Sequence, residues 1–232
     1  MHLPDEPAAP DDDALAARCG AMTADQRRHT ALLALWRLRG PLLVLGTDPA
    51  WGIHRTAVER VFEAMLAAPG AGAWTEAVAG LAPFLTDPPE SEPDGTLAEV
   101  QLEVLAELSA WRPSGDPGPD ATERIVRLAR DLSRSLDTSS ADRLWDHPAR
   151  RAHARYLAAL PAGGTGTGTG TGTGYHEARN HVVEAACHDL VAALPPGAAL
   201  PDTAAGEEAL ARCEAFGAEL AVTLAWHENL GR

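Results

Sequence analysis

The chain has 232 residues, of which 45% are hydrophobic and 22% charged, so it can form one globular domain with a substantial core. Its 19 basic residues are all arginine and stand against 33 acidic ones, which gives a formal net charge of −14. The lack of lysine excludes a phosphate-binding loop of the GxxxxGK(S/T) type, a Schiff-base lysine and a lysine general base. The acidity argues against nucleic acid and anionic lipid as partners. It favours a basic protein or a cationic ligand, and the alternative is that it serves solubility alone.

The apolar residues are of the kind that favours helices. Alanine and leucine dominate, and isoleucine occurs only at Ile53 and Ile125. Alanine and leucine lose little side-chain freedom in a helix, whereas the β-branched and aromatic residues that favour strands are scarce. The composition therefore predicts an all-α fold, a multi-helix bundle of about seven to nine helices with no significant sheet. The excess of Ala, Arg, Gly and Pro is typical of a GC-rich bacterial genome.

Composition divides the chain into four segments. The first is acidic and proline-rich, which predicts disorder, and a later run of alternating glycine and threonine predicts a flexible loop. That run is not a dinucleotide-binding loop, because from Gly164 on its glycines fall only on even positions and the odd step of GxGxxG never occurs. The segments are a disordered tail at residues 1–10, a helical domain at 11–160, the glycine–threonine linker at 161–174, and two C-terminal helices at 175–232 that pack on the same domain.

Capping residues and glycine–proline pairs mark the predicted helix ends. Thr23 and Gln26 form a capping box, and Gly40-Pro41 is expected to end or kink the helix that follows. Asp120, with Glu123 three residues later, is expected to open another helix in the same way. The remaining predicted helices cover residues 11–22, 49–68, 74–81, 96–111, 148–160, 176–194 and 203–229, the last of them opened by Asp202.

Cysteine usage and hydropathy predict a cytoplasmic protein. Cys19, Cys187 and Cys213 are odd in number and form no CxxC pair, so no disulfide framework is expected. Cys187 falls on an apolar helix face and is expected to be unreactive. The N-terminus is acidic and has no apolar segment of a secretory signal. The longest apolar stretch, ALLALWRLRGPLLVL, is interrupted by two arginines and a proline and is too short to span a bilayer.

Four residues with metal-binding side chains lie on one face of the helix expected at 176–194. Glu177, His181, Glu184 and His188 follow i+4 and i+3 spacings, which bring them within about 60° of one another. Together with His227 of the next helix they could ligate zinc or iron, as inward-facing Glu and His side chains of helical bundles do.

The apolar face of the same helix points away from this stripe. Val183, Cys187, Leu190 and Leu194 define the apolar face, and its centre lies about 120° from the imidazoles and carboxylates. We therefore expect most of the stripe to face water, where Glu–His pairs at i+4 support the helix. His227 continues the apolar stripe of the last helix and is expected to point inward, near a C-terminus whose dipole favours it.

A cluster of arginines stands out in the acidic chain at DHPARRAHARY. Arg150, Arg151 and Arg155 lie close together and could bind an anion, a carboxylate group or a partner. The alternative is that they pair with the protein's own acidic helices. No serine stands in a GxSxG setting, and no catalytic residue is predicted.

From His29 to Leu160 the order of elements resembles that of a bacterial all-helical family of unknown function typified by YjaG. The similar stretches are ALLALWRLRGPLLVL, TDPAWGIHRTAVERVFEAML, VQLEVLAELSAW and HPARRAHARYLAAL. The glycine–threonine tract and the long final helix depart from that pattern. The resemblance implies a fold and no particular activity.

The sequence predicts a non-enzymatic helical protein that acts by binding another protein, as an adaptor or a toxin-neutralising partner does. The grounds are the missing lysine and nucleophile motifs, the solvent-facing stripe and an acidic surface suited to a basic partner. The alternative is a metal-dependent enzyme that uses the Glu/His stripe of the 176–194 helix with zinc or iron as its cofactor. Neither hypothesis fixes the oligomeric state, and a homo-oligomer is compatible with both.

Overall fold

The computed structural model describes residues 12–45, 55–66, 71–81, 96–112, 115–144 and 174–230. These residues form eight α-helices and one short 3-10 helix and contain no strand, which confirms the predicted all-α fold for this part of the chain. The elements are α1 (Asp12–Ala21), α2 (Ala24–Leu45), α3 (Arg55–Leu66), α4 (Ala71–Ala79), α6 (Thr96–Ala110), α7 (Gly118–Leu144), α9 (Tyr175–Ala192), η1 (Leu200–Asp202) and α10 (Ala204–Leu230).

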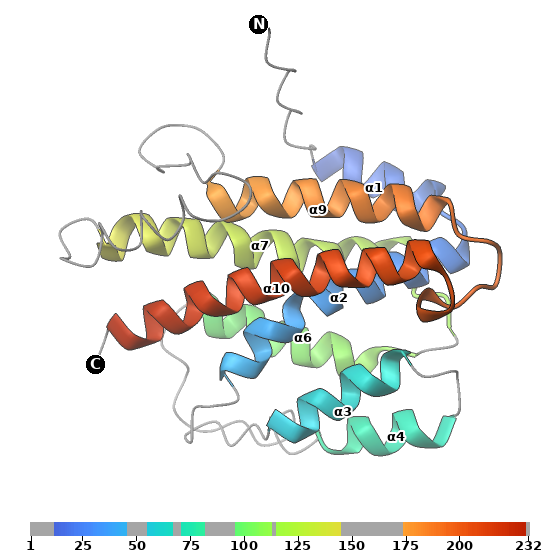
Figure 1. Cartoon of the computed structure of the whole chain (residues 1–232), viewed down its shortest axis with the longest axis horizontal. Coiled ribbons are helices and arrows are strands. Elements are labelled where there is room, and N and C mark those ends of the chain that lie inside the picture. Colours follow the sequence, from blue (N-terminus) through green and yellow to red (C-terminus); the bar gives the residue numbers. More distant parts are fainter. Residues whose placement is uncertain are drawn as a thin grey trace, which may run out of the picture.

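Helix α2 lies at the centre of the bundle (Figure 1). It packs most extensively against α10 and α7, and it also contacts α3, α6 and α9. Helix α9 packs against both α7 and α10, so the two C-terminal helices share one core with the earlier ones. Helices α3 and α4 form a pair beside α2, and α1 lies along α7.

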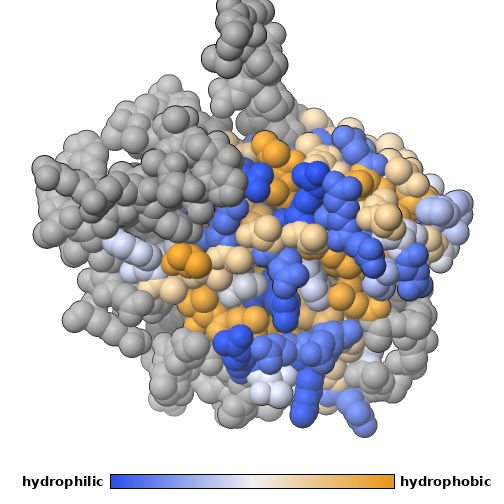
Figure 2. All heavy atoms as spheres, in the orientation of Figure 1, coloured by the Kyte–Doolittle hydropathy of each residue, from blue (hydrophilic) through white to orange (hydrophobic). Residues whose placement is uncertain are grey.

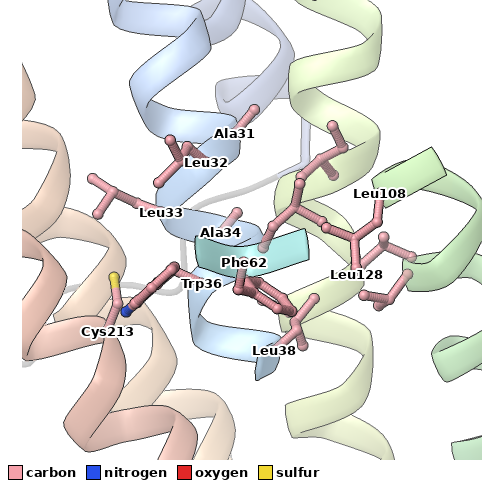
Figure 3. Packing of buried hydrophobic residues seen from close by; sticks show 14 of the residues in the cluster. Ala31, Leu32, Leu33, Ala34, Trp36, Leu38, Phe62, Leu108, Leu128 and Cys213 are labelled. Carbon is pink, nitrogen blue, oxygen red and sulfur yellow. The ribbon is translucent and has the colours of Figure 1, made fainter. Parts of the chain in front are cut away.

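Every described α-helix contributes buried apolar side chains to one continuous core. The apolar periodicity of the sequence accounts for this, because residues spaced three and four apart share a helix face. Figure 3 shows side chains of α2 on one side of Phe62 from α3, with Leu108 and Leu128 of the neighbouring helices on the other. Trp36 meets Phe62 edge to face, with 5.6 Å between the ring centroids, a geometry that aromatic pairs favour.

The predicted capping box at the start of α2 is confirmed. The backbone N–H of Thr23 donates to Oε1 of Gln26 at 2.9 Å, and the N–H of Gln26 donates to Oγ1 of Thr23 at 3.2 Å. The sequence left open whether Gly40-Pro41 ends or kinks the helix. The prediction that the helix ends there is wrong, because α2 continues through Pro41 to Leu45. The proline ring removes one helical hydrogen bond to the carbonyl of Arg37, and packing against α10 compensates for it.

That packing is a close crossing of α2 and α10 at two glycines. A Cβ added at Gly40 would lie 2.5 Å from the carbonyl oxygen of Gly217, and a Cβ added at Gly217 would lie 2.6 Å from the carbonyl oxygen of Arg37. Both distances are shorter than any real Cβ contact. Pro41 has no N–H to donate to the carbonyl of Arg37. This carbonyl therefore faces the Cα of Gly217, where a weak Cα–H···O contact is favourable.

Helix α7 begins two residues earlier than predicted, so the expected cap at Asp120 is wrong. Oδ1 of Asp116 accepts the backbone N–H of Gly118 at 2.9 Å, and Gly118 adopts a φ of +76°, which favours glycine. Arg27 of α2 binds the same carboxylate at 2.8 and 2.5 Å. Hydrogen bonds from Arg27 and then from Gly118 lower the pKa of Asp116 to about 2. The start of α7 is therefore set by a contact with α2, which local sequence does not encode.

The ends of α9 and α10 lie within two residues of their predicted positions. The cap of α10 is Thr203, whose Oγ1 accepts the N–H of Gly206 at 3.0 Å; Asp202, the predicted cap, belongs instead to η1. The predicted tail at 1–10, the helix at 148–160 and the linker up to residue 173 lie outside the described residues. No helix in the described part of the chain is both long and apolar enough to cross a bilayer.

Candidate functional site

The inward face of α9 is half polar. His176, Asn180 and Glu184 follow one another at i+4 spacing and are all buried, and Cys187 comes one position before the next step. Residues four apart lie above one another on a helix, so these side chains form a row between α9 and the helices packed against it. Buried polar groups need hydrogen-bond partners, and α2, α7 and α10 supply them.

Arg130 of α7 and Glu184 form a two-point ion pair inside the bundle. Nε and Nη2 of Arg130 donate to the two oxygens of Glu184 at 3.0 and 2.6 Å, and the two side chains are only 3% and 7% exposed. Nη1 of Arg18, on α1, lies 3.6 Å from the same carboxylate. Burial by itself would raise the pKa of Glu184, but the hydrogen bonds from Arg130 and the charge of Arg37 outweigh burial and lower it.

Arg37 of α2 is a second fully buried guanidinium, 2% exposed. Its Nη1 donates to Oδ1 of Asn180 at 2.6 Å, and its Nε has no hydrogen-bond partner among the described residues. No carboxylate of the described residues lies within ion-pair distance of Arg37, whereas Glu184 already pairs with Arg130 and Arg18. Three arginines thus surround one carboxylate, and the interior beside Arg37 carries an excess of positive charge.

A small cavity of about 20 Å³ borders this charge excess. It is large enough for one water-sized molecule. Its walls combine apolar side chains of α1, α2 and α7 with the polar row of α9. The lining residues are Leu15, Arg18, Met22, Thr30, Leu33, Arg37, Val126, Glu184, Cys187, His188 and Val191.

Two cysteines meet where α9 packs on α10. The Sγ atoms of Cys187 and Cys213 lie 3.4 Å apart, and both side chains are buried and free of disulfides. Nothing in their sequence separation predicted this contact, which depends on the register of the two helices. The pKa of Cys187 is lowered, first by its hydrogen bond with Cys213 and further by the charge of Arg37. The same hydrogen bond, together with burial, raises the pKa of Cys213.

His176 connects three helices at the beginning of α9. Its Nδ1 lies 2.8 Å from Oδ1 of Asp137 on α7, and its Nε2 lies 3.0 Å from Oγ1 of Thr223 on α10. Asp137 also accepts the backbone N–H groups of His176 and Glu177 at 3.1 and 2.9 Å, so a carboxylate of α7 caps α9. A Cβ added at Gly174, the last residue of the glycine–threonine tract, would collide with Asp137.

The order Asp137–His176–Thr223 is that of an acid–base–hydroxyl triad. The surroundings argue for a structural role. His176 and Thr223 are completely buried, and the Thr223 hydroxyl also donates to the carbonyl of Glu219 at 3.1 Å. Neither residue lines the small cavity beside Arg37 or a second cavity that lies between α6 and α7. A nucleophile must reach its substrate, so we interpret this arrangement as a cap that joins α9 to α7 and α10.

The structure separates the four predicted stripe residues. The expectation that the stripe faces water is wrong for Glu184, which is buried because Arg130 pairs with it. Glu177 is half-buried and pairs with Arg134 at 3.1 Å. His181 is half-buried, and its pKa is lowered by burial and then by the charge of Arg130. His188 is half-buried with Nδ1 3.7 Å from Asp189.

The expected inward side of α9 is confirmed. Val183 and Cys187 are buried, and Leu190 and Leu194 pack against the core as partly buried residues. Among the side chains that the structure describes, no group of three or more His, Cys, Asp or Glu residues is placed to hold a metal ion. The side chain of His227 and all of Arg150, Arg151 and Arg155 lie outside the described residues, so the roles predicted for them stay predictions.

A second cavity, of about 320 Å³, lies between α6 and α7. Its charged walls are occupied within the fold. Arg124 pairs with Glu107, Asp116 pairs with Arg27, and Nη1 of Arg112 donates to the last carbonyls of α6, the shortest bond being 2.8 Å to Trp111. These pairings stabilise the junction of the two helices and leave no charged group of the wall without a partner.

Comparisons with known proteins found no match for the chain among protein-family models, curated proteins or solved structures. The resemblance to the YjaG-like family therefore stays a prediction. Any functional proposal has to be based on the residues themselves.

Proposed function

We propose that this chain is a non-enzymatic, cytoplasmic helical protein that binds a basic segment of another protein on the outward side of α9 and α10. One observation carries the proposal. Among the described residues only two large apolar side chains are well exposed, Val182 at 51% and Val222 at 48%. One lies on α9 and the other on α10, and these two helices pack side by side.

Small apolar residues continue this surface. Further exposed positions on the same two helices hold alanines, namely Ala185 on α9 and Ala211, Ala215 and Ala218 on α10. Alanine has no side-chain entropy to lose on binding, and its small size lets a partner backbone approach closely. We call the six residues Val182, Ala185, Ala211, Ala215, Ala218 and Val222 the outer face. Figure 2, viewed from the side on which α9 and α10 lie, shows apolar atoms there among hydrophilic ones.

Acidic residues surround the outer face. Asp189, with an 87% exposed side chain, lies on α9, and Glu207, Glu208 and Glu214 are exposed on α10. The one arginine of the exposed class on these two helices within the described range, Arg212, pairs with Glu208 at 2.6 Å. Two copies of a chain with a net charge of −14 repel one another. Charge complementarity therefore favours a basic partner over a second copy.

The buried side of α9 supports the same proposal. The contacts of His176, Asn180 and Glu184 fix α9 to α7, α2 and α10. A face that is held rigid before binding loses less conformational entropy when a partner docks. The polar row inside the bundle thus holds the outer face in place and needs no catalytic role.

Affinity purification from the native host tests the proposal when wild-type chain and two variants are compared. Val182→Glu combined with Val222→Glu places charge on the outer face, and Ala106→Glu makes a similar change at an exposed position of α6, which packs against α2 and α7. We expect one basic protein to be retained by the wild type and by Ala106→Glu and lost by the double variant. Retention by the double variant, or recovery of no specific protein in several growth conditions, contradicts the proposal.

Sedimentation of the purified chain tests the choice of partner. We expect a monomer whose mass does not change in the double variant. A wild-type dimer that dissociates in the double variant would assign the outer face to a second copy and would overturn the proposal of a basic partner.

A further inference from the structure

Cys187 and Cys213 lie in the position of a dithiol that can close to a disulfide. They come from adjoining antiparallel helices, and their Sγ atoms are 3.4 Å apart. A disulfide needs an S–S distance of about 2 Å, so the two sulfurs have to come closer by about 1.4 Å for the bond to form. Cys19, the third cysteine, is buried on α1 and has no contact of this kind.

The surroundings make the two thiols unequal. Arg37 is buried without a carboxylate partner, and an anion beside it is favoured in a medium of low dielectric constant. The hydrogen bond with Cys213 and the charge of Arg37 lower the pKa of Cys187, while the pKa of Cys213 is raised. Cys187, which its place on an apolar face predicted to be unreactive, is thus suited to act as the thiolate and Cys213 as the thiol.

The small cavity gives access to only one of the two sulfurs. Cys187 lines it together with Arg18, Arg37 and Glu184, whereas neither Cys213 nor Cys19 does. A volume of about 20 Å³ admits a molecule the width of water. Hydrogen peroxide is small enough to enter the cavity, whereas a thiol-containing peptide is too large.

We propose that Cys187 and Cys213 form a peroxide-reactive pair that closes to an intramolecular disulfide between α9 and α10. The Cys187 thiolate attacks one oxygen of hydrogen peroxide, an S–O bond forms, the O–O bond breaks, and hydroxide leaves to become water with a proton from solvent. Cys213 then attacks the sulfur of this sulfenic acid. The S–S bond forms, the S–O bond breaks, and the departing hydroxide takes the proton of Cys213 as a second water. Two thiols lose two electrons, and one peroxide is reduced to two waters.

This inference does not depend on the partner-binding proposal, since it concerns the inward side of α9. Oxidation would join the two helices of the outer face covalently. The disulfide would form without any change to the exposed residues Val182 and Val222. The two proposals therefore fail or succeed separately.

Intact-mass measurement of the reduced full chain after brief treatment with equimolar hydrogen peroxide tests the inference directly. We expect the chain to lose the mass of two hydrogens, peptide mapping to place the bond between Cys187 and Cys213, and dithiothreitol to restore the original mass. Cys19 serves as the internal control and should stay reduced. An unchanged mass, a bond that includes Cys19, or a disulfide-linked dimer would overturn the inference.

Single variants separate the roles of the two thiols. Cys213→Ser should stop the reaction at a sulfenic acid on Cys187 that a dimedone probe captures, and Cys187→Ser should abolish both capture and disulfide. Arg37→Gln should slow the loss of mass by about tenfold. Arg39 pairs with the exposed Glu214, so the control variant Arg39→Gln should leave the rate of this loss unchanged. Equal capture by dimedone in Cys213→Ser and Cys187→Ser contradicts the inference. If Arg37→Gln fails to fold, the mass change of the peroxide-treated wild type decides whether the inference holds.

Discussion

Arg130 and Glu184 join α7 to α9 through two parallel hydrogen bonds, of 3.0 and 2.6 Å, that are buried from solvent. The pair determines which way α9 turns. The apolar residues Val183, Cys187 and Val191 are buried on the same side of α9 as Glu184, and the pair satisfies the carboxylate there. With it, Glu184 is buried, and the surface side of α9 is left to Val182 and Ala185.

Removing one member of this pair should destabilise the fold strongly. Glu184→Gln removes the carboxylate that pairs with the buried guanidinium of Arg130, and Arg130→Met removes the two hydrogen bonds that this guanidinium donates to Glu184. Each change is expected to lower the free energy of unfolding by about 3–5 kcal/mol, measured by urea denaturation. The double variant Arg130→Met with Glu184→Met should lose much less than the sum of the two, because neither member of the pair is left buried without the other.

The exposed pair of Glu208 and Arg212 provides the matched control. Their side chains are 51% and 47% exposed at an N–O distance of 2.6 Å, so Glu208→Gln should leave the denaturation midpoint almost unchanged. Equal losses in Glu184→Gln and Glu208→Gln would show that the buried pair has no special role.

The glycine crossing of α2 and α10 should not tolerate a methyl group. In Gly217→Ala the new Cβ meets the carbonyl oxygen of Arg37, so the two helices must separate. We expect a loss of about 1–3 kcal/mol, as for other overpacked interiors, with a similar loss for Gly40→Ala. Thermal unfolding followed by circular dichroism measures the effect.

Gly20 of α1 is the control for that experiment. It has open space around it and no positive φ, so Gly20→Ala only reduces the freedom of the unfolded chain. The expected change is a gain of about 0.4–1 kcal/mol. A gain in Gly217→Ala as well would contradict the close crossing.

Stability should fall on mild acidification. Burial, and then the charge of Arg28, lower the pKa of His29 from 6.5; the pKa of His181 is also lowered. The unfolded chain therefore binds protons near pH 6.5 that the folded chain does not, so the stability contribution of these histidines is complete above that pH and decreases below it. The urea midpoint should be lower at about pH 5.5 than at about pH 8, and His29→Gln should reduce that difference.

Glu184 adds a second step at lower pH. Its pKa lies below 4.5 in the folded chain, so its contribution is present above 4.5 and is lost as the pH falls through the folded value. In Glu184→Gln this acid step should be absent. A midpoint that rises on acidification would contradict both assignments.

Elemental analysis of untagged protein tests the hypothesis of a metal enzyme. The described side chains of Glu177, His181, Glu184 and His188 have other partners or lie apart, so we expect less than about a tenth of a zinc or iron ion per chain. A chelator should then leave the unfolding temperature unchanged. Near-stoichiometric metal that is lost in His181→Ala would support the enzyme hypothesis against the binding proposal.

Helix positions could be predicted from sequence because local features determine them. The capping box of Thr23 and Gln26 and the apolar spacing of Ile125, Leu128 and Leu132 are visible within a few residues, and both are confirmed. The end of α2 and the start of α7 were not predictable in this way. Gly217, which lets α2 continue past Gly40, lies on α10, and Arg27, which binds Asp116 at the start of α7, lies on α2.

The buried polar row was predictable only in part. A helical wheel based on apolar residues alone treats every charged group as exposed, and this placed Glu184 on the wrong side. The available signal was an arginine within an apolar stripe, since Arg37 and Arg130 each lie among buried neighbours on their own helix. Their partners, Asn180 for Arg37 and Glu184 for Arg130, depend on how the helices pack, as does the contact of Cys187 with Cys213.

Light-activated cross-linking in the native host tests the role of the outer face most directly. A benzophenone amino acid is placed at Val182, at Val222 or at the control position Ala106, each of which is exposed. We predict that both valine positions form an adduct with the same basic protein and that the α6 position does not. An adduct from all three positions alike, or different proteins captured at Val182 and Val222, would contradict a binding face on α9 and α10.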